Sequence, residues 1–201
     1  LSAPKAALSV PGPYRDTVSY TALNHYIDNA SRRMAEAGVV PNAIYGLLIK
    51  DPLLHIVMTF ALEHLGAASA ALPGPANIDG LSLAAVFTDG QDNTFNCPVN
   101  QVRLDWLQGN GMAPARVQRS PDALCRVLFT SGSTGKPKAV AYTDRMVADR
   151  ISRFDYAFGS EFPQHARTMC CMGLASALGY LLCVYLLAKG GMFCIPEIGR
   201  A

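Results

Sequence analysis

The sequence predicts an α/β fold in which helices flank a layered, mostly parallel sheet. Short apolar runs of strand length alternate with longer segments whose apolar residues recur every three or four positions. Strands in parallel sheets are typically continuous apolar runs, because helices cover both faces of such sheets. With 201 residues, half of them apolar, the chain can form one sizeable core or two small ones.

The first half of the chain contains two predicted helices with clear boundaries. The first has Thr21 as its predicted N-cap and ends at Gly38. The second begins at Asp51 and Pro52. Aspartate is a good N-cap, and proline is well tolerated at the first helical position, because the backbone N–H that it lacks would have no acceptor within the helix there. This helix is expected to end at Gly66. Apolar runs predict strands over Ala43–Ile49, Ala67–Leu72 and Leu83–Thr88.

The second half begins with residues 89–122, which are rich in Gly, Asn, Asp and Pro and predict a surface loop with one edge strand near Val102–Leu107. Further strands are predicted over Leu124–Thr130, Ala139–Tyr142, Thr168–Met172 and Met192–Ile195, with helices after Thr143 and over Tyr180–Ala188. The stretch from Thr168 to Ala188 lacks charge, but glycines interrupt it. We therefore expect a buried strand and helix there and no membrane span.

Charge and cysteine usage exclude several classes of function. Lys and Arg exceed Asp and Glu by only two, 17 against 15, and no basic run is present, so a nucleic-acid partner is not expected. The six cysteines form no Cys-x-x-Cys pair and the four histidines are scattered, so no zinc site is predicted. Reduced thiols in apolar stretches are typical of a cytoplasmic protein, which is the predicted location.

The most informative segment runs from Leu128 to Lys138 and reads LFTSGSTGKPK. Its glycines allow backbone N–H groups to approach an anion closely, its hydroxyls donate to phosphate oxygens, and lysine adds positive charge. It is not a Walker loop, because Pro137 follows Gly135-Lys136 where that motif begins a helix. We instead expect a hairpin-like loop between two strands that binds a polyphosphate.

The run from Phe129 to Lys138 resembles the phosphate-loop signature of the adenylate-forming (AMP-binding) superfamily. This superfamily includes acyl-CoA synthetases, luciferases and the adenylation domains of peptide synthetases. The signature is an aromatic residue followed by Thr-Ser-Gly-Ser-Thr-Gly-x-Pro-Lys, and this chain matches it throughout. Outside the loop, the helix beginning at Tyr20-Thr21 and the segment from Ala43 to Pro73 are similar to the family more loosely.

The resemblance implies a two-step reaction. A carboxylic acid attacks the α-phosphate of ATP, pyrophosphate leaves, and the thiol of CoA or of a carrier-protein pantetheine then takes the acyl group. In that scheme the loop holds the β- and γ-phosphates and stabilises the leaving pyrophosphate. The residues expected to bind ATP phosphates are Thr130, Ser131, Gly132, Ser133, Thr134, Gly135 and Lys138. Lys136 occupies the variable position of the signature and is not expected to make a specific contact.

Residues 1–201 resemble the N-terminal part of an AMP-binding (adenylation) domain, without its C-terminal domain. No Tyr-Gly-x-Thr-Glu segment is present, so the glutamate that helps to hold magnesium in this family is expected beyond Ala201. We therefore predict no catalytic residue and no metal ligand within these residues, and no complete adenylation by them alone. An exposed apolar patch is also expected, and a dimer is one way to cover it.

The acyl pocket of the family is expected to match the stretch from Met172 to Gly179. Ser176 stands where many acyl-CoA synthetases carry a histidine, and the aspartate with which peptide-synthetase domains bind an amino group is absent. Ser176 and Gly179 are the candidate substrate-pocket residues, although simple packing is the alternative for Ser176. The absent aspartate argues against an amino-acid substrate, and the absent histidine leaves the class of acid open.

The leading hypothesis from the sequence is an AMP-forming acid–thiol ligase of the acyl-CoA synthetase type. One alternative is a carrier-protein-loading adenylation enzyme, which uses the same loop with a different thiol. The other is a catalytically silent, truncated module that binds nucleotide or a partner without turnover.

Overall fold

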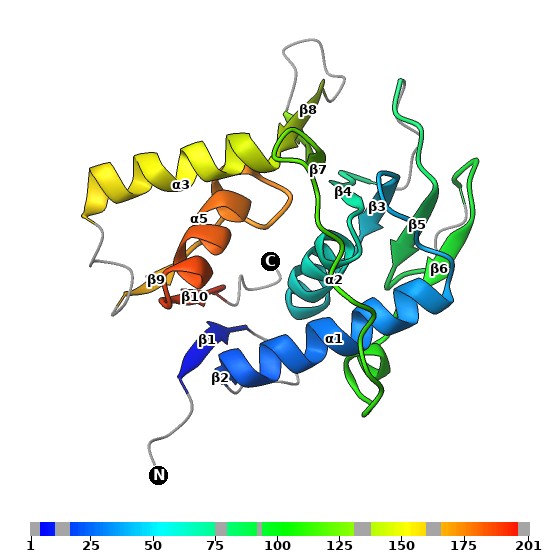
Figure 1. Ribbon diagram of the computed structural model, residues 1–201, viewed down its shortest axis with the longest axis horizontal. Coiled ribbons are helices and arrows are strands. Elements are labelled where there is room, and N and C mark those ends of the chain that lie inside the picture. Colours follow the sequence, from blue (N-terminus) through cyan, green and yellow to red (C-terminus); the bar gives the residue numbers. More distant parts are fainter. Residues whose placement is uncertain are drawn as a thin grey trace, which may run out of the picture. The chain divides into compact units, whose positions relative to one another are not determined.

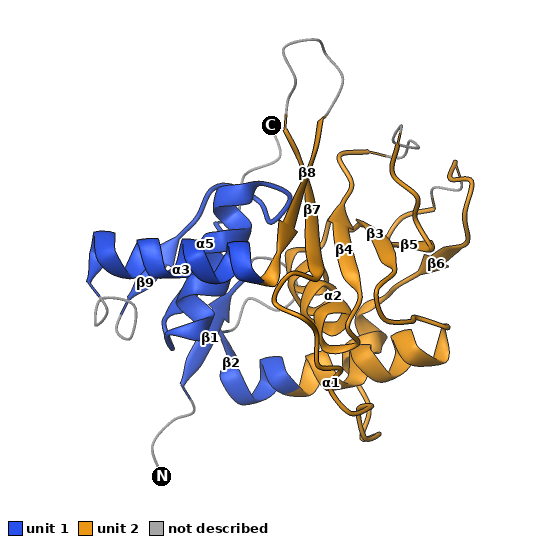
Figure 2. Cartoon of the chain, turned by 45° about the horizontal axis from the view of Figure 1, so that its top comes forward, with its two compact units in different colours: residues 1–24, 145–201 blue, residues 25–144 orange. Residues whose placement is uncertain are grey.

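The structure is a computed structural model that describes residues 5–10, 17–74, 80–91, 94–130, 138–159 and 166–196. It contains two compact units (Figure 2). Unit 1 comprises residues 1–24 and 145–201, and unit 2 comprises residues 25–144. Each unit has its own sheet, so the predicted α/β architecture of mostly parallel strands flanked by helices is confirmed, with the strands divided between two sheets rather than placed in one.

Unit 2 is built on a six-stranded sheet with the order β6-β5-β3-β4-β7-β8 (Figure 1). Its strands are β3 (Ile44–Leu48), β4 (Ala68–Ala71), β5 (Ala85–Thr88), β6 (Val99–Gln101), β7 (Leu124–Thr130) and β8 (Lys138–Thr143). All neighbouring pairs are parallel except β7 and β8, which are antiparallel. The carboxyl ends of β3, β4, β5, β6 and β7 therefore lie at one edge of the sheet.

Helix α2 (Pro52–His64) packs against β3 and β4 (Figure 1). The Asp51 carboxylate accepts a hydrogen bond from the Leu54 amide at 2.9 Å, and Pro52 occupies the first turn, as predicted. The helix ends before Gly66, whose φ of +74° is the left-handed conformation that favours glycine. Local sequence alone therefore predicted both ends of α2.

The two faces of this sheet differ in polarity. Strand alternation places Ala70 and Val127 on one face, where they form an apolar cluster with Leu72, Val86 and Phe95. Ser69 and Arg126 alternate with them and point to the opposite face, where Arg126 bonds Ser69 and polar groups of α2. One face of the sheet thus carries an apolar cluster and the other a buried polar cluster.

Unit 1 contains a four-stranded sheet with the order β2-β1-β10-β9. Its strands are β1 (Ala6–Ser9), β2 (Thr17–Ser19), β9 (Arg167–Met169) and β10 (Met192–Cys194), and its helices are α3 (Asp144–Phe158, from Arg145 on) and α5 (Ala177–Ala188). Within this unit the Tyr20 hydroxyl donates to the Gly191 carbonyl at 2.6 Å, just beyond the carboxyl end of α5. Burial raises the pKa of Tyr20 to about 12.

Most of the predicted strands and helices are confirmed within one to three residues, and three differences stand out. Helix α1 (Tyr20–Glu36) is capped by the Ser19 hydroxyl, which accepts from the Ala22 amide at 3.1 Å, so the prediction of Thr21 as the cap was wrong. Strands β1 and β2 were not predicted. The edge strand is β6, and the region around Leu104–Leu107 forms the 3₁₀ helix η1 instead.

The stretch predicted as a buried strand and a buried helix forms β9 and α5. The prediction that the strand is buried was wrong, because the ends of β9 are exposed. Across the described ranges, every helix is too short or too polar to cross a bilayer.

Two glycines with positive φ provide a matched test of the turn after α2. Gly66→Ala should lower the free energy of unfolding by more than Gly38→Ala. Both positions require the left-handed conformation, with φ of +74° and +86°, which costs alanine about 1 kcal/mol. Only at Gly66 would the new Cβ also lie 2.6 Å from a methyl carbon of Val117, while at Gly38 it meets nothing within 4 Å.

Urea unfolding of the two variants and the wild type measures this difference, which overpacking should make about 1–3 kcal/mol. Equal losses at the two positions would show that the Val117 contact relaxes without cost.

Candidate functional site

The predicted phosphate-binding run begins at the carboxyl end of β7 in unit 2. Open α/β sheets bind their ligands at the carboxyl edge of the parallel strands, because the loops and helix N-termini there present unpaired backbone donors. Strand β7 ends with Thr130 at this edge, and β8 begins there with Lys138. The location therefore fits the role that the sequence predicts.

Thr130 and Lys138 are direct cross-strand partners in the β7–β8 ladder, and both are exposed. Opposed residues of antiparallel strands have Cα atoms about 4.5–5.5 Å apart, so a threonine and a lysine stand side by side at the base of the connecting segment. Of the other predicted ligands, Ser131, Gly132, Ser133, Thr134 and Gly135 lie outside the described residues. The first and last residues of the predicted site are thus brought together, and the remaining five stay a prediction.

The segment after Pro137 forms strand β8, as the sequence predicted. A Walker loop would instead run directly into a helix. The antiparallel pairing of β7 with β8 therefore confirms the predicted strand on each side of the run.

A second feature of the carboxyl edge is the carboxylate of Asp89, which follows β5. It accepts hydrogen bonds from the backbone amides of Lys50 at 2.9 Å and Asp51 at 2.8 Å. These bonds join the end of β5 to the turn between β3 and α2. Sequence analysis did not single out Asp89, although an acidic residue directly after a buried strand was an available signal.

A buried polar cluster lies behind the hairpin, on the α2 face of the sheet. Arg126 of β7 has no exposed surface and donates to the hydroxyls of Thr59 at 2.9 Å and Ser69 at 2.8 Å. Its guanidinium also lies 3.2 Å from Nε2 of His55. Sequence analysis missed Arg126, although one charged residue within an otherwise apolar strand could have drawn attention to it.

The contacts of His55 determine its tautomer. A guanidinium can only donate, so Nε2 accepts from Arg126 and the proton of the neutral ring lies on Nδ1, 3.3 Å from the Ile49 carbonyl. Burial, reinforced by the positive charge of Arg126, lowers the pKa of His55 to about 3. The ring is therefore neutral and serves as a hydrogen-bonding link between β7 and the end of β3.

The candidate substrate-pocket residues lie in unit 1 and have local structural roles. Ser176 is the N-cap of α5: its hydroxyl accepts from the Gly179 amide at 3.0 Å and donates to the Gly173 carbonyl at 2.9 Å. Gly179 is buried, and a Cβ there would lie 2.5 Å from the Met172 carbonyl oxygen. These contacts explain both residue types by packing, and their predicted role as substrate contacts remains a prediction.

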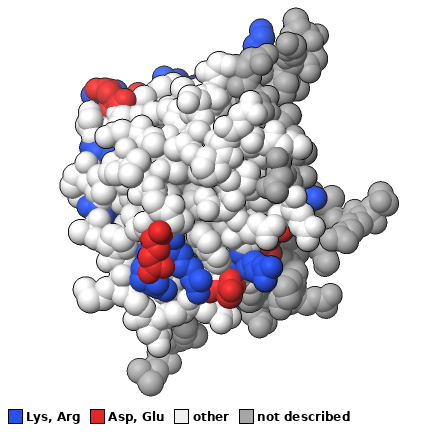
Figure 3. Space-filling view, turned by 90° about the vertical axis from the view of Figure 1, so that its right-hand side faces the viewer, with Lys and Arg blue, Asp and Glu red and all other residues white. Residues whose placement is uncertain are grey.

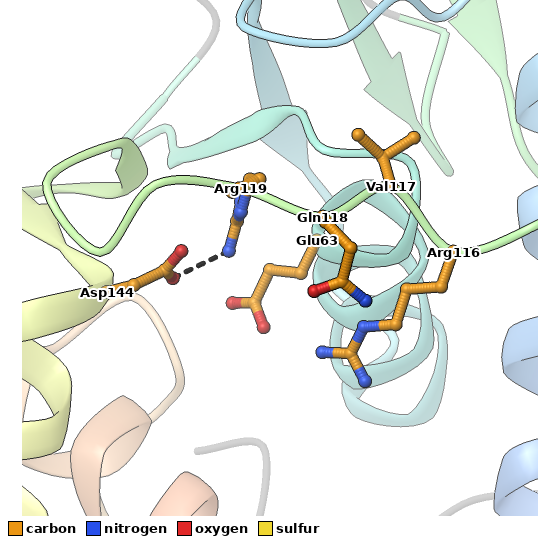
Figure 4. Close-up of a pocket in the computed structure, with 6 residues that line it drawn as sticks. All are labelled: Glu63, Arg116, Val117, Gln118, Arg119 and Asp144. Carbon is orange, nitrogen blue, oxygen red and sulfur yellow. Dashed lines mark hydrogen bonds and ion pairs between the residues drawn. The ribbon is translucent and has the colours of Figure 1, made fainter.

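A polar groove of about 370 Å³ lies on unit 2 (Figure 4). Glu63 at the end of α2, the extended segment 116–119 and Asp144 line it, and Arg119 pairs with Asp144 at 2.6 Å. These residues precede β4 and β7 and follow β8, so the groove lies at the amino edge of the sheet. It is therefore at the opposite edge from Thr130 and Lys138 and contains none of the predicted site residues.

The charges on the described surface are mixed. On the face drawn in Figure 3, Lys and Arg side chains lie in small groups with Asp and Glu, and most of the described surface is uncharged. No three His, Cys, Asp or Glu side chains gather into a metal-binding group within the described part of the chain.

Comparison with known proteins relates this geometry to one family. The model of the AMP-binding enzyme family matches residues 78–200. The nonribosomal peptide synthetase sidE of Aspergillus fumigatus is 31% identical over 159 residues, which cover 72% of this chain and 8% of that protein. The chain therefore spans less than a tenth of this relative.

Two solved structures share the fold. The o-succinylbenzoate CoA synthetase MenE of Bacillus subtilis has a TM-score of 0.81 at 16% identity, covering 98% of this chain and 42% of its own. The N-terminal subdomain of NpsA from Klebsiella oxytoca, in complex with 3-hydroxybenzoyl-AMSN, has a TM-score of 0.80 at 18% identity, covering 98% of this chain and 51% of its own. At these identities the two structures establish the fold alone.

Because the His55 ring is buried and neutral, we expect part of the stability of the folded state to be lost at low pH. Its pKa is lower in the folded state, about 3, than the ordinary 6.5. The unfolded chain therefore binds a proton that the folded chain does not between these values. Stability from this group is complete above pH 6.5 and is lost as the pH falls toward 3, with a slope approaching about 1.4 kcal/mol per pH unit.

Urea unfolding between pH 7 and pH 5, compared with His55→Gln, isolates this component, because glutamine does not titrate. The wild-type curve should fall more steeply than that of the variant. Parallel curves would show that His55 is protonated in the folded state or already neutral in the unfolded chain.

Proposed function

The chain belongs to the AMP-binding enzyme family, and from this premise we propose that it provides the phosphate-binding part of an enzyme that activates a carboxylic acid with ATP. The observation that carries the proposal is the β7–β8 hairpin at the carboxyl edge of the sheet. It presents exposed Thr130 and Lys138 side by side at the ends of a run of hydroxyls and glycines. Such a run supplies the hydroxyl and backbone donors that a triphosphate requires.

The proposed reaction has two steps. The carboxylate oxygen of the acid forms a bond to the α-phosphorus of ATP, the bond to the bridging oxygen breaks, and pyrophosphate leaves with the electron pair. A thiol then replaces AMP on the resulting acyl-adenylate and a thioester forms. The proposed role of Thr130, Lys138 and residues 131–135 is to hold the β- and γ-phosphates and to stabilise the charge that develops on pyrophosphate.

Magnesium usually accompanies ATP and would offset part of the phosphate charge. The side chains described around Thr130 do not form a metal-binding group of their own. We therefore assign no step of the proposed reaction to a metal ligand of this chain.

For the second step, a carrier-protein pantetheine thiol is the acceptor that the relatives favour, because sidE, a nonribosomal peptide synthetase, is the relative with 31% identity. CoA is the alternative, in line with the CoA synthetase among the structural neighbours. That likeness rests on the fold alone. The proposed AMP-forming acid–thiol ligase activity is common to both acceptors.

Acid-dependent ATP–pyrophosphate exchange by the complete protein tests the activation step. Against a panel of fatty, aryl and amino acids, at least one acid should support exchange. Lys138→Ala should lower the exchange rate by about 100-fold, because one positive donor to the leaving pyrophosphate is removed. The matched control is Arg116→Ala, which removes an exposed positive charge at the opposite edge of the same sheet and should leave the rate unchanged.

Thioester formation with CoA and with a pantetheine-loaded carrier protein then separates the two acceptors. ATP binding without exchange for any acid would overturn the enzyme proposal in favour of a silent nucleotide-binding module. Equal losses in the Lys138 and Arg116 variants would remove Lys138 from the proposed site.

A further inference from the structure

Among the described residues, Arg126 is the one Lys, Arg, Asp or Glu residue in the fully buried core, with 0% of its surface exposed. It lies on β7, four residues before Thr130. Burying a guanidinium is unfavourable unless well-placed partners satisfy it, and an apolar side chain of similar volume is often at least as stable. A role in stabilising the core is therefore a poor explanation for an arginine at this position.

The ladder that attaches β7 to the parallel part of the sheet is short. Strands β4 and β7 are in register only at Ser69↔Arg126 and Ala70↔Val127, whereas β7 and β8 pair over six positions as far as Thr130↔Lys138. The β7–β8 hairpin is thus paired within itself over more positions than it is paired with β4. The apolar cluster of Val127 and Ala70 also holds β7 against the sheet, so the angle of the hairpin depends on side-chain contacts as well as on the ladder.

Arg126 provides the additional attachment at the first of these two ladder pairs. Its guanidinium bonds the hydroxyl of Ser69, its own partner on β4, and reaches across to Thr59 and His55 on α2. The Thr59 hydroxyl in turn donates to the His55 carbonyl at 2.8 Å, which closes the group. Because a guanidinium is planar and rigid, bonds in several directions determine orientation as well as distance.

The same cluster extends to the carboxyl edge. His55 contacts the Ile49 carbonyl, and the next two backbone amides, of Lys50 and Asp51, hold the Asp89 carboxylate. The strand that leads to the phosphate-binding run is thereby connected through side chains to the turns after β3 and β5. An arginine at position 126 can set where the end of the hairpin lies among these turns.

We propose that Arg126 is a positioning residue for the phosphate site, which holds the β7–β8 hairpin at the angle required to bind the β- and γ-phosphates of ATP. The inference rests on the proposed function, because it assumes that the end of this hairpin binds those phosphates. Arg126 itself is buried behind the hairpin and touches no substrate. Its loss should therefore weaken ATP binding and leave binding of AMP, which lacks both phosphates, unaffected.

The experiment measures the Kd values of ATP and AMP by calorimetry for the complete wild-type protein and for Arg126→Met, which replaces the guanidinium with an unbranched apolar chain. A small misplacement of binding groups has large effects, so the Kd of ATP should rise by about tenfold. The Kd of AMP should stay the same. Arg126→Lys, which retains charge without the planar fork, should recover part of the ATP affinity.

The matched control is Arg116→Met, the same substitution at an exposed arginine of unit 2, and both Kd values should be unchanged. If Arg126→Met does not fold, Ser69→Ala removes one acceptor of the guanidinium and should raise the Kd of ATP selectively by a smaller factor. Hydrogen exchange gives a readout without ligand, since the amides of β7 and β8 nearest Thr130 and Lys138 should exchange faster in either variant.

The outcomes separate this inference from the proposed function. A wild-type protein that binds ATP no more tightly than AMP would overturn the proposed phosphate site and the inference with it. A wild-type preference for ATP that folded Arg126→Met retains in full would overturn the inference alone. Equal weakening of ATP and AMP would show that Arg126 acts on the whole unit rather than on the hairpin.

Discussion

The parallel pairing of β5, β3, β4 and β7 is the constraint on which the rest of unit 2 depends. Parallel neighbours cannot be joined by a tight turn, so the chain must return along the outside of the sheet before each new strand. Those returns are α2 and the long segments before β5 and β7. They also bring the carboxyl ends of the strands, with Asp51, Asp89 and Thr130, to a single edge.

Strand β8 differs from the other strands of this sheet because it pairs antiparallel with its neighbour β7. An antiparallel neighbour can follow directly, and Pro137 disfavours a helical conformation at Lys136. The β7–β8 hairpin therefore extends the sheet. Two ladder pairs join β7 to β4, so side-chain contacts also determine the orientation of the hairpin relative to the sheet. These contacts are the apolar cluster around Val127 on one face and the polar cluster around Arg126 on the other.

The sequence predicted the features whose causes are local and missed those whose causes are distant. Both ends of α2 follow from Asp51, Pro52 and Gly66, and the hairpin follows from the run that ends at Lys138. Strands β1 and β2 have four and three residues, and β1 pairs with β10 almost the whole chain length away, so no local pattern predicts them. The choice of Ser19 over Thr21 as the cap of α1 is similarly tertiary, because Ser19 is held in β2 opposite Ala6.

The same distinction applies to individual residues of interest in each unit, and it limits what Ser176 can do. Arg126 meets side chains 57 to 71 residues away, which no spacing rule could have paired. Ser176 is instead explained by residues close to it in sequence. Its hydroxyl donates a hydrogen bond to the Gly173 carbonyl and accepts one from the Gly179 amide. A hydroxyl has one donor and two acceptor positions, so only an acceptor position is left. In this capped state Ser176 cannot donate to a substrate carboxylate, and any contact it makes with an acid must be to a donor group elsewhere on that molecule.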